Sequence, residues 1–578
     1  MNNNNELNKN HRATESPDIR VVVGLDFGTT YSGFAYCHVN DENDICSNHS
    51  WCGEEGQIKT NTVLQYDDEY DEVKSWGAPA LAKRPTRRSR KSMIEENKPV
   101  ELFKLHLGDI LEEFKPKLPV DYRKAITDYL REIGKIIKDT VSTRWPLINY
   151  FENVLLILTV PAEFSEISKA VMRKCAFNAK LINKEDSINL QFTTEPEAAA
   201  VYCMKKNLNE QSLAQPGTNF MIVDCGGGTV DVTTRQLMNN GQLGEITERA
   251  GNFCGSAFID TEFIKYLRKV LGDEPMDLLR DNHYGQMQYL IQQYSRNCKI
   301  PFTGDNPEFL YELDIQDAAP ILKQYVTNED IREQLEENEW TIDIDFKIMK
   351  LVFEPVIQQI FNLIRSQLCN NRGTCSAIFL VGGFSESKYL QKRIKQEFQC
   401  IVKNISVPSL PMAAISRGAT IYGLSIRSNL NNLGNNNSII SSRILKYTYG
   451  CDMWKKWKEG DPIHRRTPEG FIVKFKCLAR RGTKMDVNQE VTVTRVPIYI
   501  NQKDMITKIY YTREYDAEYC DDPGMKLLGN LIVDFPGEGF NRRILFGLTF
   551  GKMEITATSK DKQTGQSYKS TFKFDLED

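Results

Sequence analysis

Two glycine-rich segments decide how this chain folds: VVVGLDFGTTYSG at residues 21–33 and FMIVDCGGGTVDVTT at residues 220–234. In each, an apolar run typical of a strand leads into an aspartate, glycines and threonine, and strand-like sequence follows. Glycine has no Cβ, so such turns bring bare backbone N–H groups close to a phosphate chain. The aspartates suit a hydrated Mg²⁺ better than they suit phosphate. Facing each other, the two turns predict a clamp for a nucleoside triphosphate.

Length and composition indicate an ordinary globular chain with several domains. The 578 residues exceed a single core, and 41% are hydrophobic and 26% charged. The net charge of −4 gives no reason to expect a nucleic acid or an anionic membrane as partner. No apolar run approaches the ~20 residues of a membrane span. The polar first 18 residues lack the apolar core of a secretory signal. The 14 scattered cysteines form no C-x-x-C pair, which is typical of reduced thiols. We therefore expect a cytoplasmic protein, with the nucleus as the alternative location.

Changes in sequence character along the chain predict its domains. We expect a disordered Asn-rich tail at 1–18 and an α/β domain at 19–427, in which predicted strands alternate with amphipathic helices. Its two lobes would span about 19–205 and 218–427. Six asparagines in the ten residues from Ser428 to Asn437 predict a linker at 428–441. Few helical periods follow, and an antiparallel β-sandwich is predicted over 442–578, with strands at 471–477, 491–496, 506–511 and 544–557.

Each glycine-rich turn combines carboxylates with groups that suit phosphate. Three consecutive glycines, Gly226–Gly228, are hard to explain as a simple turn because they cost conformational entropy. Asp224 would hold Mg²⁺ through water, Thr229 would donate to the γ-phosphate, and Asp231 would orient or deprotonate a water. The alternative for Asp231 is a solvated strand residue. The first turn, residues 26–31, is by itself equally well explained as a β-turn without a ligand.

Two further segments point to the same cleft. Pro196 suits the first turn of a helix, so Glu195 would lie at a helix N-terminus that faces the cleft. A simple helix cap is the alternative for Glu195. Gly382 and Gly383 stand between a predicted strand and an amphipathic helix at 388–398, which aims a helix N-terminus at an anion or a ribose.

In this order and spacing, the four segments resemble the nucleotide-binding domain of the 70-kilodalton heat-shock protein family, which has the actin-like ATPase fold. The resemblance covers about residues 19–427 and continues more faintly at 527–536 and 548–565. The Val381–Ser387 segment and the short C-terminal part look like a divergent branch of that family rather than its abundant chaperones. The resemblance implies ATP or ADP with Mg²⁺ as cofactors. It also implies that the β domain binds an unfolded peptide, a protein client or a signalling partner.

The resemblance implies catalytic roles residue by residue. Lys104 matches the lysine that neutralises charge on the γ-phosphate. Asp26, Glu195 and Asp224 match the acidic residues around the hydrated metal ion. Asp231 matches the acidic residue near the attacking water.

The same resemblance implies nucleotide contacts and an interdomain switch. Pro161 matches the switch proline, and Lys169 stands where an arginine relays the nucleotide state to the β domain. The nucleotide-binding positions are Gly28, Thr29, Thr30, Tyr31, Gly226, Gly227, Gly228, Thr229, Lys299, Gly382, Gly383 and Phe384.

Several positions depart from the family pattern, mostly around the adenosine. Arg296 stands where the family has an adenine-binding glutamate, and Ile300 replaces a basic residue that stacks on the base. Ser256 and Ala257 replace a Gly-Glu pair near the ribose, and Phe384 replaces a small serine. The helical lid that follows the β domain in the family has no counterpart in this sequence. The phosphate end of the site is therefore expected to be intact and the adenosine end remodelled.

Three functions fit this sequence. The leading one is a slowly hydrolysing, atypical chaperone-like ATPase. The second is a nucleotide-gated interaction module with little or no hydrolysis, which the remodelled adenosine pocket and missing lid favour. The third is a small-molecule kinase of the same actin-like superfamily, such as a sugar kinase, against which the β-sandwich argues.

Overall fold

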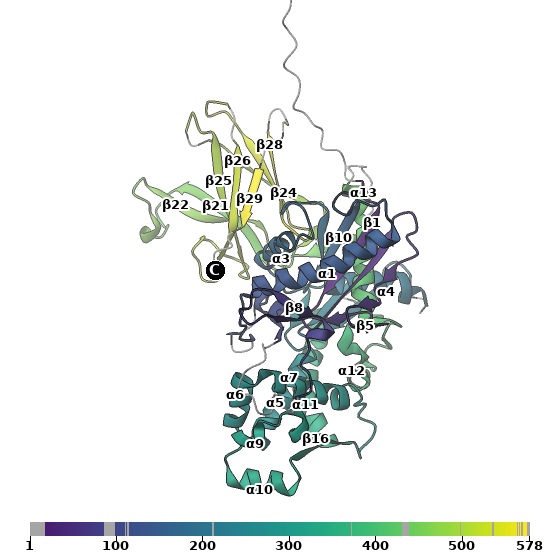
Figure 1. Ribbon diagram of the computed structural model, residues 1–578. Helices are drawn as coiled ribbons and strands as arrows, with labels where there is room; N and C mark the ends of the chain where they lie inside the picture. Colours follow the sequence, from purple (N-terminus) through teal and green to yellow (C-terminus); the bar gives the residue numbers. More distant parts are fainter. Residues whose placement is uncertain are drawn as a thin grey trace, which may run out of the picture.

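The computed structural model describes residues 18–85, 99–109, 111–112, 115–210, 213–370, 373–430, 438–497, 499–534, 537–562, 565, 567 and 570–574. The predicted tail lies outside these ranges except for Asp18. Strands β21, β22, β24, β25, β26, β28 and β29 gather at one end of the molecule, and α6, α9 and α10 gather at the opposite end (Figure 1). Among the described residues, no helix combines the length and the apolar character that crossing a membrane requires.

The first glycine-rich segment forms the centre of a mixed sheet. Its two arms, β1 and β2, pair antiparallel, and the next strands along the chain, β10 and β11, add in parallel on the β1 side. The strand order is β11-β10-β1-β2-β3, and β6 also pairs with β2. The strands are β1 (Val21–Phe27), β2 (Tyr31–His38), β3 (Cys46–Ser47), β6 (Thr60–Asn61), β10 (Val154–Val160) and β11 (Leu190–Thr194).

The second glycine-rich segment forms the centre of another sheet with the same pattern. Its arms β12 and β13 pair antiparallel, and β18 and β19 add in parallel on the β12 side. The order is β19-β18-β12-β13-β14-β20-β23, and β15 also pairs with β13. The strands are β12 (Asn219–Cys225), β13 (Val230–Leu237), β14 (Leu243–Glu245), β15 (Ala250–Asn252), β18 (Ala377–Val381), β19 (Asn404–Ser406), β20 (Ile440–Ile444) and β23 (Lys484–Asp486). Both glycine-rich turns therefore occupy the same place in their sheets.

Amphipathic helices complete the core of each sheet. Helices α1 (Tyr122–Arg144) and α3 (Glu166–Asn178) bury apolar side chains with the first sheet. Side chains of Asp121 and Ser165 cap their first turns by accepting bonds from backbone N–H groups. On the second sheet, α5 (Ala257–Leu271), α11 (Phe346–Asn370) and α12 (Lys388–Phe398) do the same. The predicted helix at 388–398 is confirmed.

Two helices lie between the sheets. The small residues at the start of α4 (Glu195–Glu210) share a buried cluster with α13 (Ala414–Leu430) and with strands of both sheets. The Thr420 hydroxyl of α13 donates to the Ala35 carbonyl of β2 at 3.2 Å. Helix α13, the last helix of the predicted second lobe at 218–427, therefore packs against the first sheet as well as the second.

The C-terminal part forms two antiparallel sheets with a shared core. One has the order β22-β21-β25-β26-β29 and the other β24-β27-β28, and apolar side chains of both meet in one cluster. The strands are β21 (Thr448–Lys456), β22 (Phe471–Ala479), β24 (Glu490–Arg495), β25 (Asp504–Thr512), β26 (Lys526–Asp534), β27 (Ile544–Thr549), β28 (Thr556–Asp561) and β29 (Ser570–Phe574). In the described part after α13, the only helical element is the 3₁₀ turn η7 (Ile463–Arg465).

Two predicted boundaries in this part differ from the structure. The strand predicted at 544–557 is a hairpin, β27 and β28, because the chain reverses at Gly551–Glu554. The predicted linker at 428–441 overlaps α13 at its start and β20 at its end. Residues 431–437 lie outside the described ranges. Strand β20 pairs in parallel with β14, so this segment joins the second sheet rather than the β-sandwich.

The remaining elements are short and lie at the periphery of the two sheets. Near the first sheet they are β4 (Ser50–Trp51), β5 (Glu54–Glu55), β7 (Val63–Tyr66), β8 (Val73–Trp76), η1 (Ala78–Ala80), β9 (Val100–Glu101), η2 (Phe103–Leu107) and α2 (Tyr150–Asn153). Near the second they are α6 (Asp273–Asn282), α7 (Tyr284–Tyr294), the π-helical turn η4 (Ser295–Lys299), β16 (Leu310–Asp314), α8 (Ile315–Ala318), α9 (Leu322–Tyr325), α10 (Glu329–Glu337), β17 (Thr341–Asp345), η5 (Gly383–Glu386) and η6 (Pro411–Ala413).

Candidate functional site

The two glycine-rich turns face each other directly. A Cβ placed on Gly227 would lie 1.9 Å from the Thr30 hydroxyl, and one on Gly228 would lie 2.6 Å from the Thr29 hydroxyl. Any side chain at either glycine would therefore collide with the opposite turn. The structure brings together the two segments that the sequence predicted to form one clamp, although 200 residues separate them.

Hydrogen bonds fix the shape of each turn. In the first, the Gly28 N–H donates to the Ser32 hydroxyl at 3.2 Å, and the Thr62 hydroxyl donates to the Gly28 carbonyl at 2.9 Å. In the second, the Gly226 N–H donates to the Thr229 carbonyl at 2.9 Å. The chain entering α5 then donates three backbone N–H groups, from residues 255–257, to the carbonyls of the glycine run. Both turns are thus held without using their remaining N–H groups.

Four carboxylates converge between the turns: Asp26, Glu195, Asp224 and Asp231. All four are buried, so Asp231 is not a solvated strand residue, and the cleft-facing position of Glu195 stays a prediction. Burial and the neighbouring charges of Glu195, Asp231 and Asp26 raise the pKa of Asp224 well above its usual value. Burial, with the charges of Glu195 and Glu163, raises the pKa of Asp231 to about 7. The cluster therefore carries more negative charge than it can hold ionised by itself.

Two buried ammonium groups reach into this cluster. Lys104 donates to the Glu195 carboxylate at 2.7 Å and to the Phe27 carbonyl at 2.5 Å. Lys104 thus contacts one of the predicted metal-holding carboxylates, and its catalytic role stays a prediction. The second ammonium, that of Lys59, lies 2.6 Å from the Asp26 carboxylate. Sequence reasoning missed Lys59, which stands in a polar stretch with no motif around it.

The donor set fits a hydrated divalent cation. Buried oxygens of Asp224 (Oδ1) and Asp231 (Oδ2) have no hydrogen-bond partner within the described structure. Such oxygens are costly unless a water or an ion satisfies them. Over the same described residues, no group of three or more His, Cys, Asp and Glu side chains could hold a metal ion. The prediction was a metal held through water by Asp26, Glu195 and Asp224. Of these three, Asp224 has an unpaired oxygen, whereas Asp26 and Glu195 pair with Lys59 and Lys104.

The adenosine turn packs against the carboxylates. Gly382 has a φ of +82°, and a Cβ there would lie 2.5 Å from Asp224 Oδ1. Gly383, beside it, borders open space. The ring of Phe384 is buried in the hydrophobic core of the second sheet. The prediction that Phe384 contacts nucleotide needs correction for its side chain, because the ring points into that core.

Lys299 is bound to Asp260 on α5. Its ammonium donates to both oxygens of Asp260, at 2.6 and 2.7 Å, and to the Ser256 carbonyl at 3.4 Å. Ile300, next to it, is exposed. Four positions that depart from the family pattern, Ser256, Ala257, Arg296 and Ile300, thus belong to or flank α5 and η4. Tyr31, at the end of the first turn, is also exposed.

The predicted switch residues contact the C-terminal part. The Lys169 ammonium, on α3, pairs with Glu166 and donates to the Met553 carbonyl in the β27–β28 connection. Pro161 begins the turn before α3 and lines a small cavity with Lys169 and Arg443. Lys169 therefore lies at the junction where the resemblance predicted it.

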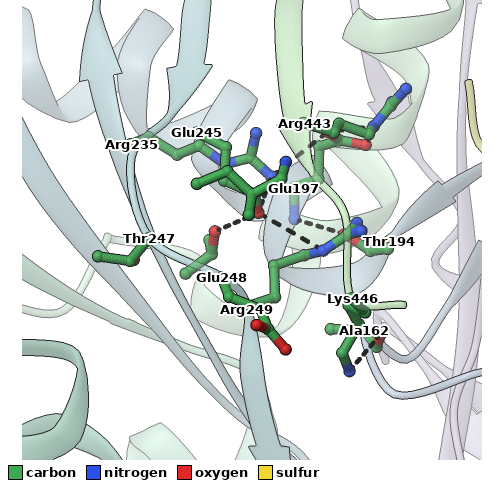
Figure 2. A network of polar contacts seen from close by, with 12 residues as sticks. Ala162, Thr194, Glu197, Arg235, Glu245, Thr247, Glu248, Arg249, Arg443 and Lys446 are labelled. Carbon is green, nitrogen blue, oxygen red and sulfur yellow. Dashed lines mark hydrogen bonds and ion pairs between the residues drawn. The ribbon is translucent and has the colours of Figure 1, made fainter. Parts of the chain in front are cut away.

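A buried ionic network joins the same parts and was not predicted. Arg443, on β20, donates to both oxygens of Glu197, on α4, at 3.0 and 2.8 Å, and its third nitrogen donates to the Gly551 carbonyl at 2.5 Å. Arg235, on β13, lies 3.4 Å from Glu197 and 3.2 Å from Glu245. Figure 2 shows these arginines gathered around Glu197. The sign of this network in the sequence was limited to Glu197, a second glutamate two residues after Glu195.

Comparison with known proteins extends along almost the whole chain. Heat shock 70 kDa protein 12A of Mus musculus is 25% identical over 654 aligned residues, which cover 97% of this chain and 93% of that protein. Heat shock 70 kDa protein 12B of Homo sapiens is 22% identical, over 97% of this chain and 92% of that protein. The chaperone protein HscA homolog of Acinetobacter baylyi is 22% identical over 59% of this chain and 54% of its own. A family model described as a domain of unknown function (DUF8340) matches residues 214–406.

Proposed function

Since the chain is a relative of the 70-kilodalton heat-shock protein family, in its divergent branch, we propose that it binds ATP or ADP with Mg²⁺ and hydrolyses ATP slowly to ADP and phosphate. Its C-terminal β-sheets would bind a peptide or protein partner. One observation carries the proposal: four buried carboxylates and the Lys104 ammonium lie between two glycine-rich turns that face each other.

The residues of the cleft would divide the work between binding and catalysis. Turn N–H groups and the hydroxyls of Thr29 and Thr229 would bind the phosphates, in the way glycine-rich turns bind anions. Asp26, Glu195 and Asp224 would hold Mg²⁺ through water, and Mg²⁺, when bound, supplies neutralisation of phosphate charge.

Two buried side chains would act on the reacting groups. The Lys104 ammonium, fixed by the Glu195 carboxylate and the Phe27 carbonyl, would stabilise negative charge on the transferred phosphoryl group. The free Oδ2 of Asp231 would accept a hydrogen bond from the attacking water and orient it.

We also propose that the two sheets are duplicated lobes of an actin-like ATPase domain over residues 19–427. Their common strand pattern supports this, and so does the position of both glycine-rich turns in the central hairpins. Helices α4 and α13, packed between the sheets, would transmit relative motion of the lobes. Residues 442–578 would form the partner-binding domain, apart from β20 and β23, which join the second sheet.

A second candidate function is a nucleotide-gated interaction module with little hydrolysis. The pairing of Lys299 favours this candidate. Asp260 binds its ammonium group, whereas the corresponding lysine of the family packs along the adenosine. In this case nucleotide binding would shift the equilibrium between open and closed clefts, and a bound partner would sense that shift.

Titration calorimetry with ATP, ADP and GTP, together with phosphate release from the same preparation, tests both candidates. We expect wild-type protein to bind ATP and release phosphate slowly. Asp224→Ala should lower phosphate release roughly 100-fold or more, because it removes a metal-holding carboxylate. Asp330→Ala, an exposed aspartate on α10, is the matched control and should behave as wild type.

Each outcome of this experiment separates the candidates. ATP binding with no phosphate release from clean wild-type protein would rule out the ATPase and favour the gated module. Absence of binding by all three nucleotides would rule out both. Equal phosphate release by Asp224→Ala and wild type would show that the activity does not arise in this cleft.

A further inference from the structure

The ammonium of Lys59 is an unexpected member of the carboxylate cluster. It lies 2.6 Å from Asp26 Oδ2, and the two side chains are 7% and 2% exposed. Lysine is among the residues least often buried, and a buried lysine is paired when it occurs. Neither the motifs of the sequence nor the proposed mechanism assigns Lys59 a role.

The local fold delivers this side chain to Asp26. Strand β6 pairs with the beginning of β2, in the register Ser32 with Thr60, so Lys59 enters the sheet edge beside the first turn. Its aliphatic stem then crosses Gly33: a Cβ there would lie 2.9 Å from Lys59 Cγ and 2.7 Å from the Ile58 carbonyl. The glycine that ends the first motif therefore leaves the space through which Lys59 reaches the cleft.

The charge of Lys59 acts on more than its direct partner. It lowers the pKa of Glu195 and of Asp224, against the larger effect of burial that raises both. It also lowers the pKa of Glu386, at the end of the adenosine turn, again against burial. Lys104 is already engaged by Glu195. Among the described residues, Lys59 is thus the cation bound to Asp26, while oxygens of Asp224 and Asp231 stay unpaired.

We propose that Lys59 is a resident counter-cation that sets the Mg²⁺ requirement of this site. Without a divalent cation, its ammonium neutralises Asp26 and keeps the cluster folded. With a divalent cation, the ammonium competes with it for the Asp26 carboxylate. The inference rests on the proposed function, because it assigns Asp26 to the metal. Lys59 is a positioning residue and does not need to touch the nucleotide.

Removing the charge of Lys59 has two effects, and both favour binding of a divalent cation. Without Lys59, the carboxylates of the metal-free cluster repel one another more strongly. Binding of a divalent cation therefore becomes more favourable. Asp26 is also released from its competing partner. Both effects predict that a neutral residue at position 59 lets Mg²⁺ act at lower concentration, while the metal-free protein becomes less stable.

The first experiment measures the metal-free protein without nucleotide. Thermal unfolding in chelator is followed for wild type, Lys59→Met, Asp26→Asn and the double variant. We expect Lys59→Met to lower the melting temperature, because it leaves Asp26 unpaired and buried. Adding Asp26→Asn to Lys59→Met should recover most of the loss. A double-mutant cycle with no coupling between the two positions would overturn the inference.

The second experiment measures how stabilisation by ADP depends on Mg²⁺. At saturating ADP, the half-saturating Mg²⁺ concentration should fall by at least about fivefold in Lys59→Met. Lys59→Arg keeps the charge and should stay near wild type. Lys135→Met, which removes an exposed lysine paired with Glu132 on α1, is the control for loss of a lysine.

The outcomes distinguish this inference from the proposed function. An unchanged Mg²⁺ requirement in folded Lys59→Met would overturn the inference. A raised requirement would also overturn it, because that result assigns Lys59 to phosphate binding. If wild type shows no stabilisation by ADP at any Mg²⁺ concentration, the proposed function fails, and the metal-free cycle alone decides whether Lys59 is the counter-cation.

Discussion

Gly382 is a residue whose lack of a side chain the site depends on. Its φ of +82° disfavours other residues, and a Cβ would lie 2.5 Å from both Asp224 Oδ1 and the Cys225 carbonyl. We expect Gly382→Ala to cost about 1–3 kcal/mol in the free energy of unfolding and to weaken ATP binding by displacing Asp224. Chemical denaturation and calorimetry measure the two effects.

The neighbouring glycine supplies the control for Gly382. Nothing lies within 4 Å of a Cβ placed on Gly383, and its φ is outside the left-handed region. Gly383→Ala should therefore unfold almost as wild type does. Equal losses in the two variants would contradict the steric argument, since they would show that the turn needs flexibility rather than space.

Among single residues, the sequence identifies as site candidates those that belong to motifs. Asp26 and Asp224 each stand two residues before a glycine near the end of a strand, and Glu195 directly precedes a proline, so all three stand out in the sequence. Lys59 belongs to no motif, and only the folded sheet shows that its stem crosses Gly33. A single buried lysine leaves no periodic signal in the sequence, so pattern reasoning could not find it.

The buried Glu197 carboxylate, which Arg443 of β20 binds, should govern how the stability of the protein falls in acid. Burial opposes ionisation of Glu197, but the Arg443 and Arg235 guanidiniums outweigh it and lower the pKa of Glu197 to about 2. A carboxylate with a lowered pKa stabilises the fold above its ordinary value of 4.5, and loses that contribution as pH falls toward 2. The shift corresponds to a contribution of about 3 kcal/mol at neutral pH.

Unfolding measured from pH 7 to pH 3 checks this contribution. Wild type should lose stability more steeply below pH 5 than Glu197→Gln, which is less stable at pH 7 but cannot titrate at this position. Glu336→Gln, from an exposed pair with Arg332 on α10, should keep the wild-type slope. Parallel curves for wild type and Glu197→Gln would show that Glu197 does not titrate within this network.

Predictions of helices and strands succeeded where the apolar pattern is strong. They failed where pairing with another strand decides the structure. Helix α12 begins and ends at the predicted residues. By contrast, the predicted strand at 544–557 turns back on itself, and β20 leaves the predicted linker to join β14. Five residues of β20 cannot show by themselves which sheet edge they extend, because pairing depends on the neighbour.

The C-terminal sheets contact the elements around the first sheet at a hairpin connection. The connection between β27 and β28 receives three basic side chains from elsewhere in the chain: Lys169 at the Met553 carbonyl, Arg443 at the Gly551 carbonyl, and Arg173 at the Glu554 carboxylate. The sequence predicted that Lys169 lies at such a junction by resemblance only. Arg173 and Glu554 are 381 residues apart, a separation that no local pattern spans.

The Arg173–Glu554 pair measures how strongly this junction is coupled. The guanidinium donates to both carboxylate oxygens, at 2.7 and 2.6 Å, with side chains only 15% and 24% exposed. A double-mutant cycle of Arg173→Met and Glu554→Gln should give a coupling of about 1–2 kcal/mol in the free energy of unfolding. Arg480 and Asp516, an exposed pair within the C-terminal part, should give less than about 0.5 kcal/mol.

Repeating the cycle with saturating ATP and Mg²⁺ tests whether the nucleotide reaches this junction. If nucleotide binding loosens or tightens the contact, the Arg173–Glu554 coupling should change while the Arg480–Asp516 coupling stays constant, because only the first pair spans the two parts. Equal couplings with and without nucleotide, in protein shown to bind ATP, would mean that this contact is a fixed structural joint. The Arg173–Glu554 pair would then not transmit nucleotide binding to the C-terminal sheets.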